Sequence, residues 1–161
     1  MSDIHSILLA TQGWLELGNY VEAYNEIEKL PHDQRTSPDV LKLRCRIYRQ
    51  AKKWEYLSVL ARSCYNRCSE ESQFLIDWGW ADYKRGRKER AAVILLNESD
   101  RFPGSAELAF DLAIVLASLN RTKARDWLVR AFRRSPDRDK IRLKALNQPE
   151  LEKFWTEEQG Q

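Results

Sequence analysis

Apolar side chains recur along this chain in short stripes, and four tight turns separate them. Before each turn they follow the i, i+3, i+4, i+7 spacing that marks one face of an amphipathic helix, and a second stripe follows each turn. This pattern predicts an all-α protein of helix-turn-helix units. The stripes before the turns are Ile7, Ala10, Thr11 and Trp14; Leu41, Cys45 and Tyr48; Leu75, Trp78 and Gly79; and Ala109, Leu112, Ala113 and Leu116.

The turns keep a fixed register with a period of about 34 residues, and self-similarity at such a period indicates a helical repeat array. Gly18-Asn19-Tyr20 is followed one period later by Lys52-Lys53-Trp54 and after a second period by Gly86-Arg87-Lys88. The fourth turn, Asn120-Arg121-Thr122, comes one residue early. The predicted repeats cover about residues 4–37, 38–71, 72–105 and 106–138.

Small residues recur in the same register on both helices of each repeat, which predicts that the two helices approach closely there. We expect the grooves between repeats to be filled by large residues, namely Trp14, Tyr48, Trp54, Trp78 and Trp127. The small positions are Thr11, Cys45, Gly79 and Ala113 on first helices, and Ala23, Ala91 and Ala124 on second helices, with Leu57 as the exception.

The run from Gly18 to Ala23, the register of the turns and the end Ala131–Pro136 resemble tetratricopeptide (TPR) repeats over about residues 4–138. The resemblance implies a right-handed solenoid of four repeats whose first helices line a concave groove, the usual ligand face of such arrays. Fold resemblance does not identify the partner.

Solenoids need a cap over their last apolar face. We expect a cap over about residues 139–155, made of a helix at Asp139–Leu146, a break at Asn147-Gln148-Pro149 and a short segment from Glu150 to Trp155, so that residues 1–161 form a single domain. Ile141, Ala145 and Leu146 would cover the fourth repeat, with a last apolar patch of Leu151, Phe154 and Trp155 folding back on them, and Thr156–Gln161 would be frayed.

Four charged residues stand where TPR repeats usually carry apolar or small ones: Arg44, Asp82, Arg85 and Glu98. A buried unpaired charge is costly. We therefore expect Arg44 to pair with Asp82 or Asp77, or else these side chains to extend to the surface.

Composition and charge indicate the compartment of the protein and the kind of partner it would have. The chain has 43% apolar and 32% charged residues, no run of about 18 apolar residues, no apolar stretch behind a basic head at its start, and three cysteines. A cytoplasmic protein without membrane segments is the prediction. Residues 1–37 carry two basic and six acidic side chains, whereas residues 38–71 carry eight and four. This asymmetry favours an acidic partner or self-association, unless the charges only solvate long helices.

Catalytic and metal chemistry find little support. The two histidines, His5 and His32, lie near the start and in a turn, so we predict no enzyme and no cofactor. Cys64 and Cys68 could supply half of a zinc site, but no second ligand pair is near in sequence, so core packing is preferred. Arginine-rich runs at residues 84–88 and 130–138 could bind the phosphates of a nucleic acid. Acidic residues are interleaved with these runs, so a nucleic-acid partner is less favoured than a protein partner.

The resemblance also indicates where a partner protein would bind. An exposed apolar floor around Trp80, Tyr83 and Phe110, beside a basic wall of Lys42, Arg46 and Arg49, would suit an acidic or amphipathic segment. The predicted partner-binding residues are Lys42, Arg46, Arg49, Ile76, Trp80, Tyr83, Phe110 and Ile114; Leu8, Gln12, Leu15 and Ala117 complete the groove. Alternatively, the C-terminal helix or a tight superhelix fills this groove.

Two functions remain open. One is a scaffold or adaptor for an acidic partner. Compact bacterial TPR proteins that resemble kinesin light chain and accompany tubulin-like filaments suit this size and basic face, so such a filament is one candidate partner. The other is a secretion or substrate chaperone that sequesters an apolar client segment. Leu8, Gln12, Leu43, Gln73 and Asp77 do not match the clamp with which co-chaperones hold a C-terminal carboxylate.

Overall fold

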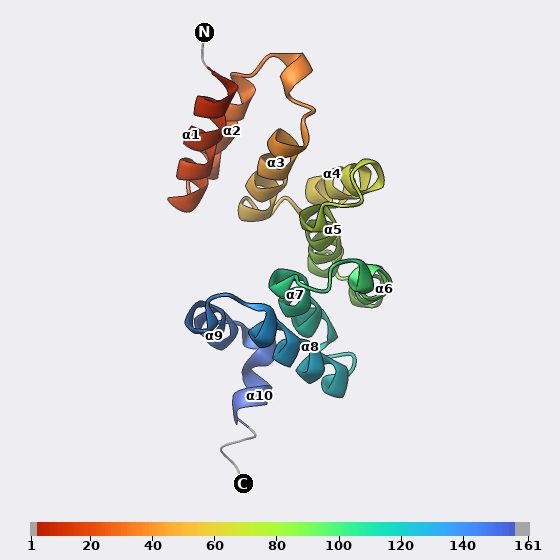
Figure 1. The fold of residues 1–161 in the computed structure, drawn as a ribbon. Coiled ribbons are helices and arrows are strands. Elements are labelled where there is room, and N and C mark those ends of the chain that lie inside the picture. Colours follow the sequence, from red (N-terminus) through yellow and green to blue (C-terminus); the bar gives the residue numbers. More distant parts are fainter. Residues whose placement is uncertain (1–2, 157–161) are drawn as a thin grey trace. The chain divides into compact units, whose positions relative to one another are not determined.

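The computed structural model describes residues 3–156, and every regular element in that range is a helix (Figure 1), which confirms the all-α prediction. The elements up to residue 84 are α1 (Ile4–Glu16), α2 (Tyr20–Glu28), the 3-10 turn η1 (His32–Gln34), α3 (Pro38–Gln50), α4 (Trp54–Arg67) and α5 (Ser72–Lys84). They are followed by α6 (Lys88–Glu98), η2 (Ser99–Arg101), α7 (Ala106–Leu116), α8 (Arg121–Arg134), α9 (Arg138–Leu146), η3 (Pro149–Leu151) and α10 (Glu152–Thr156).

The predicted register sets where the helices begin. The helices α1, α3, α5 and α7 begin at Ile4, Pro38, Ser72 and Ala106, so each start follows the last by one full period of the repeat. The starts of α2, α4 and α6 keep the same interval, and α8 begins one residue early. Both the repeat length and the one-residue slip at the fourth turn are therefore confirmed.

Three of the four turns reverse the chain through one residue in the left-handed region. Gly18 has φ +76°, Lys52 has φ +57° and Gly86 has φ +84°, and these positions lie one repeat period apart. Glycine adopts such angles readily because it has no Cβ. The fourth turn, residues 117–120, contains no residue with positive φ, in keeping with its different length.

By its contacts the chain forms two compact units, Met1–Ala81 and Asp82–Gln161, and the boundary falls inside α5. In the first unit α1 packs on α2 and α3 on α4, and α3 also contacts both helices of the preceding pair. In the second unit α7 packs on both α6 and α8. Neighbouring helices thus pack in pairs, and each pair buries the apolar faces that its own stripes supply.

The small residues lie where the register predicts them. Thr11, Cys45 and Ala113 are fully buried, as are Ala23 and Leu57, and Gly79, Ala91 and Ala124 are buried as well. The Thr11 hydroxyl donates to the Ile7 carbonyl oxygen at 2.7 Å, so this buried polar group is satisfied within its own helix. Cys64 is also buried, as predicted for a cysteine that packs as a small apolar side chain.

The prediction that Arg44 pairs with Asp82 or Asp77 is wrong. Arg44 pairs with Glu28 at 3.1 Å. The fully buried Asp77 instead pairs with Arg49 at 3.1 Å, and the carboxylate of Asp82 lies 3.3 Å from Nε of Arg90. The buried acids are therefore compensated, as the energetics require, but not by Arg44. Of the four charged residues, Arg85 pairs with Asp82, at 4.0 Å.

The C-terminal segment consists of a helix and a shorter helical segment, and it is interrupted after Leu146 as predicted. Residues 138–156 fold as α9, η3 and α10, because Pro149 cannot continue the helix before it. Ile141, Ala145 and Leu151 are buried, and η3 contacts both α7 and α9, whereas Leu146 is exposed and does not cover the repeat. The frayed end that we expect lies, beyond Thr156, outside the described residues. No helix in residues 3–156 is long and apolar enough to cross a membrane.

Candidate functional site

The first helices of the first unit border a hollow of about 490 Å³. It is open to solvent and lies between α1, α3 and the start of α5. Its lining combines aliphatic, amide and charged side chains. The lining residues are His5, Leu8, Leu9, Gln12, Asp39, Lys42, Leu43, Arg46 and Gln73.

Part of the predicted groove is therefore a real concavity. Leu8, Gln12, Lys42 and Arg46 follow from the register alone, and the structure brings all four to this one hollow. Leu15 belongs to the packed interior instead, with 2% of its surface exposed.

The two cations of the hollow differ in how they are engaged. Lys42 Nζ lies 2.9 Å from a carboxylate oxygen of Glu71, and because both side chains are about one-third exposed, this pair contributes little stability. Arg46 is exposed and forms no ion pair with any residue of the described range. Arg46 is therefore the side chain most available to an incoming carboxylate.

Arg49 has a structural task that the sequence did not reveal. Its guanidinium donates to Asp77 Oδ1 at 3.1 Å and lies over the Trp80 ring, 4.8 Å from the ring centroid. Asp77 also accepts from the Gln73 amide at 3.1 Å. This network compensates a fully buried carboxylate, so Arg49 supports the fold and does not line the hollow.

The prediction of an exposed apolar floor around Trp80, Tyr83 and Phe110 is wrong. Ile76, Trp80, Phe110 and Ile114 have between 1% and 7% of their surface exposed, so they are core residues. Tyr83 is half-buried, and its hydroxyl donates to the Glu150 carboxylate at 3.0 Å. Their assignment to partner binding therefore lacks the exposure on which it depends.

The C-terminal segment explains part of this burial within the second unit. Lys144 Nζ lies 4.9 Å from the centroid of the Phe110 ring, and the Lys153 ammonium donates to the Ala117 carbonyl oxygen. The register predicts that both Phe110 and Ala117 face a partner. In this unit the alternative of a groove filled by the chain's own C-terminal segment is the better description.

The register contains further lining residues that the prediction lacks. His5, Asp39 and Gln73 all line the hollow and are spaced by one repeat period, so they occupy one position on three successive first helices. Leu9 and Leu43 share another such position. The predicted groove follows other positions of the same register, such as that of Leu8 and Lys42, and therefore does not include these rows.

No group of three or more histidine, cysteine, aspartate or glutamate side chains that could hold a metal occurs in the described part of the chain.

Neither a known family model nor a curated protein sequence matches this chain. Its class is therefore defined by the structure: an all-helical protein of neighbouring helix pairs, with a partly basic hollow on its first helices.

Proposed function

We propose that the chain is a TPR-type adaptor that holds an acidic or amphipathic segment of a partner protein in the hollow between α1, α3 and α5. The regular spacing of helix starts and left-handed turns supports the TPR assignment. The observation that carries the binding proposal is Arg46, an exposed arginine that lines this concavity and forms no ion pair within residues 3–156.

The lining favours a segment with a carboxylate beside apolar side chains. Leu8, Leu9 and Leu43 offer apolar surface, and Arg46 offers a planar guanidinium that can hold a carboxylate through two hydrogen bonds. Asp39 lies two helical turns before Arg46 on α3, about 10 Å away along the helix axis. The partner's acid is therefore expected at the Arg46 end, since Asp39 would repel it at the other end.

The two candidate partner classes differ in their response to salt. A strongly acidic partner, such as a bacterial tubulin-like filament in the cytoplasm, would be bound through Arg46 and Lys42 and released as ionic strength rises. An apolar client of a chaperone would be held by the three leucines and would persist at high salt. We favour the acidic class because Arg46 is exposed and is not engaged in an ion pair by the described part of the chain, so that it is available to a partner's carboxylate.

The test is capture of proteins from the native cytoplasm by wild-type protein and by Arg46→Glu, at low and high salt. Lys123→Glu is the matched control, because Lys123 is an exposed cation near the start of α8, where a carboxylate suits the helix dipole. We expect Arg46→Glu to lose at least about 90% of the bound partner, consistent with loss of a charged hydrogen bond and added repulsion, and Lys123→Glu to keep it.

Arg49→Glu should not be used in this test, because it would remove the compensation of Asp77 and unfold the site. The proposal fails if Arg46→Glu, with an unchanged circular dichroism spectrum, captures the same partner as the wild type. Capture that is lost in both Arg46→Glu and Lys123→Glu would indicate a response to net charge and not to the hollow.

A further inference from the structure

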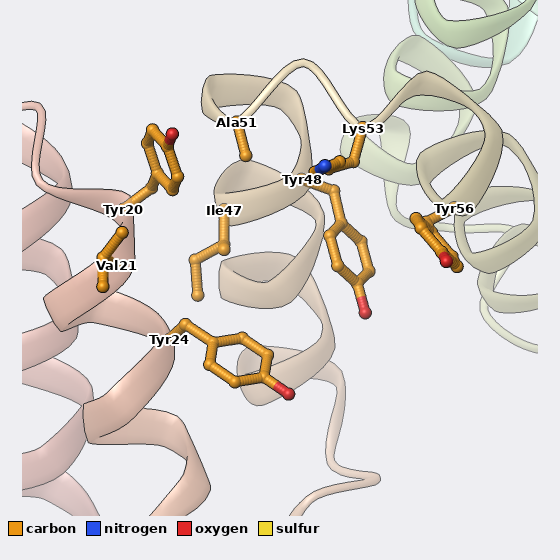
Figure 2. Close-up of a pocket in the computed structure, with 8 residues that line it drawn as sticks. All are labelled: Tyr20, Val21, Tyr24, Ile47, Tyr48, Ala51, Lys53 and Tyr56. Carbon is orange, nitrogen blue, oxygen red and sulfur yellow. The ribbon is translucent and has the colours of Figure 1, made fainter.

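A second, smaller hollow of the first unit lies beside α2, α3 and the start of α4 (Figure 2). Its volume is about 300 Å³, in the range of small-molecule sites. Tyrosine dominates its lining, and the one charged group is a lysine. The lining residues are Tyr20, Val21, Tyr24, Ile47, Tyr48, Ala51, Lys53 and Tyr56. We call this hollow the tyrosine pocket.

The pocket has a buried floor and exposed walls. Ile47, on α3, is 2% exposed and anchors the floor in the core. Tyr20, Val21 and Tyr24 stand on α2, on the other side of the pocket (Figure 2), and are 39% to 56% exposed. An aromatic wall that the helix packing does not bury is the kind of surface at which ligands bind.

The third wall is a stacked pair of rings. The Tyr48 and Tyr56 rings have centroids 5.8 Å apart and an interplanar angle of 29°, so each limits the movement of the other. A separate hollow, lined by Glu55, Tyr56 and Val59, lies beyond this pair. The two hollows share Tyr48 and Tyr56, but Glu55 does not line the tyrosine pocket, whose one charged lining residue is Lys53.

Lys53 is placed by the left-handed turn. Lys52, with φ +57°, reverses the chain, and the backbone N–H of Lys53 donates to the Tyr48 carbonyl oxygen at 2.9 Å. The backbone of Lys53 therefore lies next to Tyr48, one of the α3 residues that line the pocket. Figure 2 shows the ammonium nitrogen of Lys53 beside Tyr48.

The charge of Lys53 is uncompensated within the described range. Lys53 forms no ion pair there. The nearby Arg44, whose guanidinium lies 5.8 Å from the Tyr24 ring centroid, is already paired with Glu28. An apolar cavity with one free ammonium group at its edge is complementary to an apolar body that carries one negative charge.

We infer that the tyrosine pocket binds a small monocarboxylate with an aromatic or branched apolar body, with the body on Ile47, Val21 and Tyr24 and the carboxylate on Lys53. The site is separate from the hollow between α1, α3 and α5, and no residue lines both. This inference therefore does not depend on the proposed adaptor function.

The test uses phenylacetate and its neutral isostere phenylacetamide as probes, titrated into the full-length ¹⁵N-labelled protein and followed by amide chemical shifts. We expect shifts confined to residues 20–24 and 47–56, with a dissociation constant in the millimolar range, as the ligand efficiency of a ten-atom ligand implies. At low salt phenylacetate should bind roughly tenfold more tightly than phenylacetamide, because a charge-assisted hydrogen bond has about that effect.

Three variants separate the pocket from nonspecific binding. Lys53→Gln should remove the preference for phenylacetate over phenylacetamide, whereas Lys52→Gln, at the neighbouring lysine that does not line the pocket, should keep it. Val21→Asp places an acid in the first turn of α2, where it suits the helix dipole, and should weaken phenylacetate more than phenylacetamide.

Several outcomes would overturn the inference. Equal affinity for both probes in the wild type would remove the role of Lys53, as would an unchanged preference in Lys53→Gln. Shifts centred elsewhere would remove the pocket as the site. A peptide that ends in phenylalanine and binds where phenylacetate does not would identify a peptide site instead.

Discussion

The hydroxyl of Tyr83 donates a hydrogen bond to the carboxylate of Glu150 at 3.0 Å, across 67 residues of sequence. Tyr83 lies at the end of α5, and Glu150 lies in η3 of the C-terminal segment. A tyrosine expected to face a partner is thus engaged by the chain itself. Since the Lys153 ammonium also reaches the Ala117 carbonyl oxygen, two contacts attach this segment to residues of the predicted groove.

Removal of the Tyr83 hydroxyl should loosen the C-terminal segment. Tyr83→Phe keeps the ring but leaves Glu150 without one of its donors. We expect a loss of about 1.5 kcal/mol in the free energy of unfolding, the low end for a hydrogen bond to a charged group, because Glu150 is only partly buried. Urea denaturation measures it. Tyr56→Phe is the control, because Tyr56 is 65% exposed; an equal loss in both variants would show that the contact with Glu150 is not its cause.

The same contact should make stability depend on acid pH. Burial by itself raises the pKa of Glu150, but hydrogen bonds from Gln148 and Tyr83 outweigh it, so the pKa is lowered from its ordinary value of 4.5. A carboxyl whose folded pKa is depressed stabilises the fold above its unfolded pKa and loses that contribution as pH falls through the folded pKa.

We therefore expect the stability difference between the wild type and Glu150→Gln to be constant near neutral pH and to shrink below about pH 4.5. Urea denaturation of both proteins between pH 3 and 7 measures this difference, and the comparison cancels the titration of the other acids. A difference that stays constant down to pH 3 would contradict the lowered pKa.

The pair of Arg49 and Asp77 should be the most sensitive polar contact of the first unit. Arg49→Ala leaves a fully buried carboxylate with only its remaining donors, so we expect the free energy of unfolding to fall by about 3 kcal/mol. Because Arg49 is itself 24% exposed, water can replace part of the lost contact, and the effect should lie at the low end for buried pairs.

A double-mutant cycle checks this assignment. Asp77→Asn removes the charge that Arg49 compensates, so Arg49→Ala should matter less by at least about 1 kcal/mol when combined with it. Additive losses would mean that Arg49 contributes through its packing on the Trp80 ring and not through the carboxylate.

The fold could be read from local sequence because each repeat is stabilised by its neighbours in the chain. The starts of α3 and α5 follow from apolar periodicity, and the turns follow from Gly18 and Gly86, whose backbone angles suit glycine. These are short-range features. A single-sequence pattern is sufficient to detect them.

The site was only partly predictable, because its exposure depends on distant contacts. The register correctly brought Lys42 and Arg46 to one hollow. It could not show that Phe110 is covered, since Lys144 comes from α9 and no spacing rule links the two. Nor could it distinguish Arg46 from Arg49, because the task of Arg49 depends on Asp77, which lies 28 residues away in the sequence.

Replacement of Lys52, the residue with positive φ in the second turn, should stabilise the protein. Lys52 occupies the position that Gly18 and Gly86 hold in the first and third turns, with φ +57°. A non-glycine residue there costs roughly 1 to 2 kcal/mol, whereas glycine adds only about 0.5 to 1 kcal/mol of chain entropy to the unfolded state. We therefore expect Lys52→Gly to stabilise the protein by about 0.5 to 1 kcal/mol, measured by urea denaturation.

Gly86→Ala is the converse experiment. A Cβ added at Gly86 would meet no atom within 4 Å, so any loss of stability must come from the backbone angle of +84° and not from a clash. We expect a loss of about 1 kcal/mol, since alanine is disfavoured in this region. If Lys52→Gly destabilised the protein while Gly86→Ala did not, the turns would not be governed by this backbone preference, and the lysine side chain itself would have to stabilise the second turn.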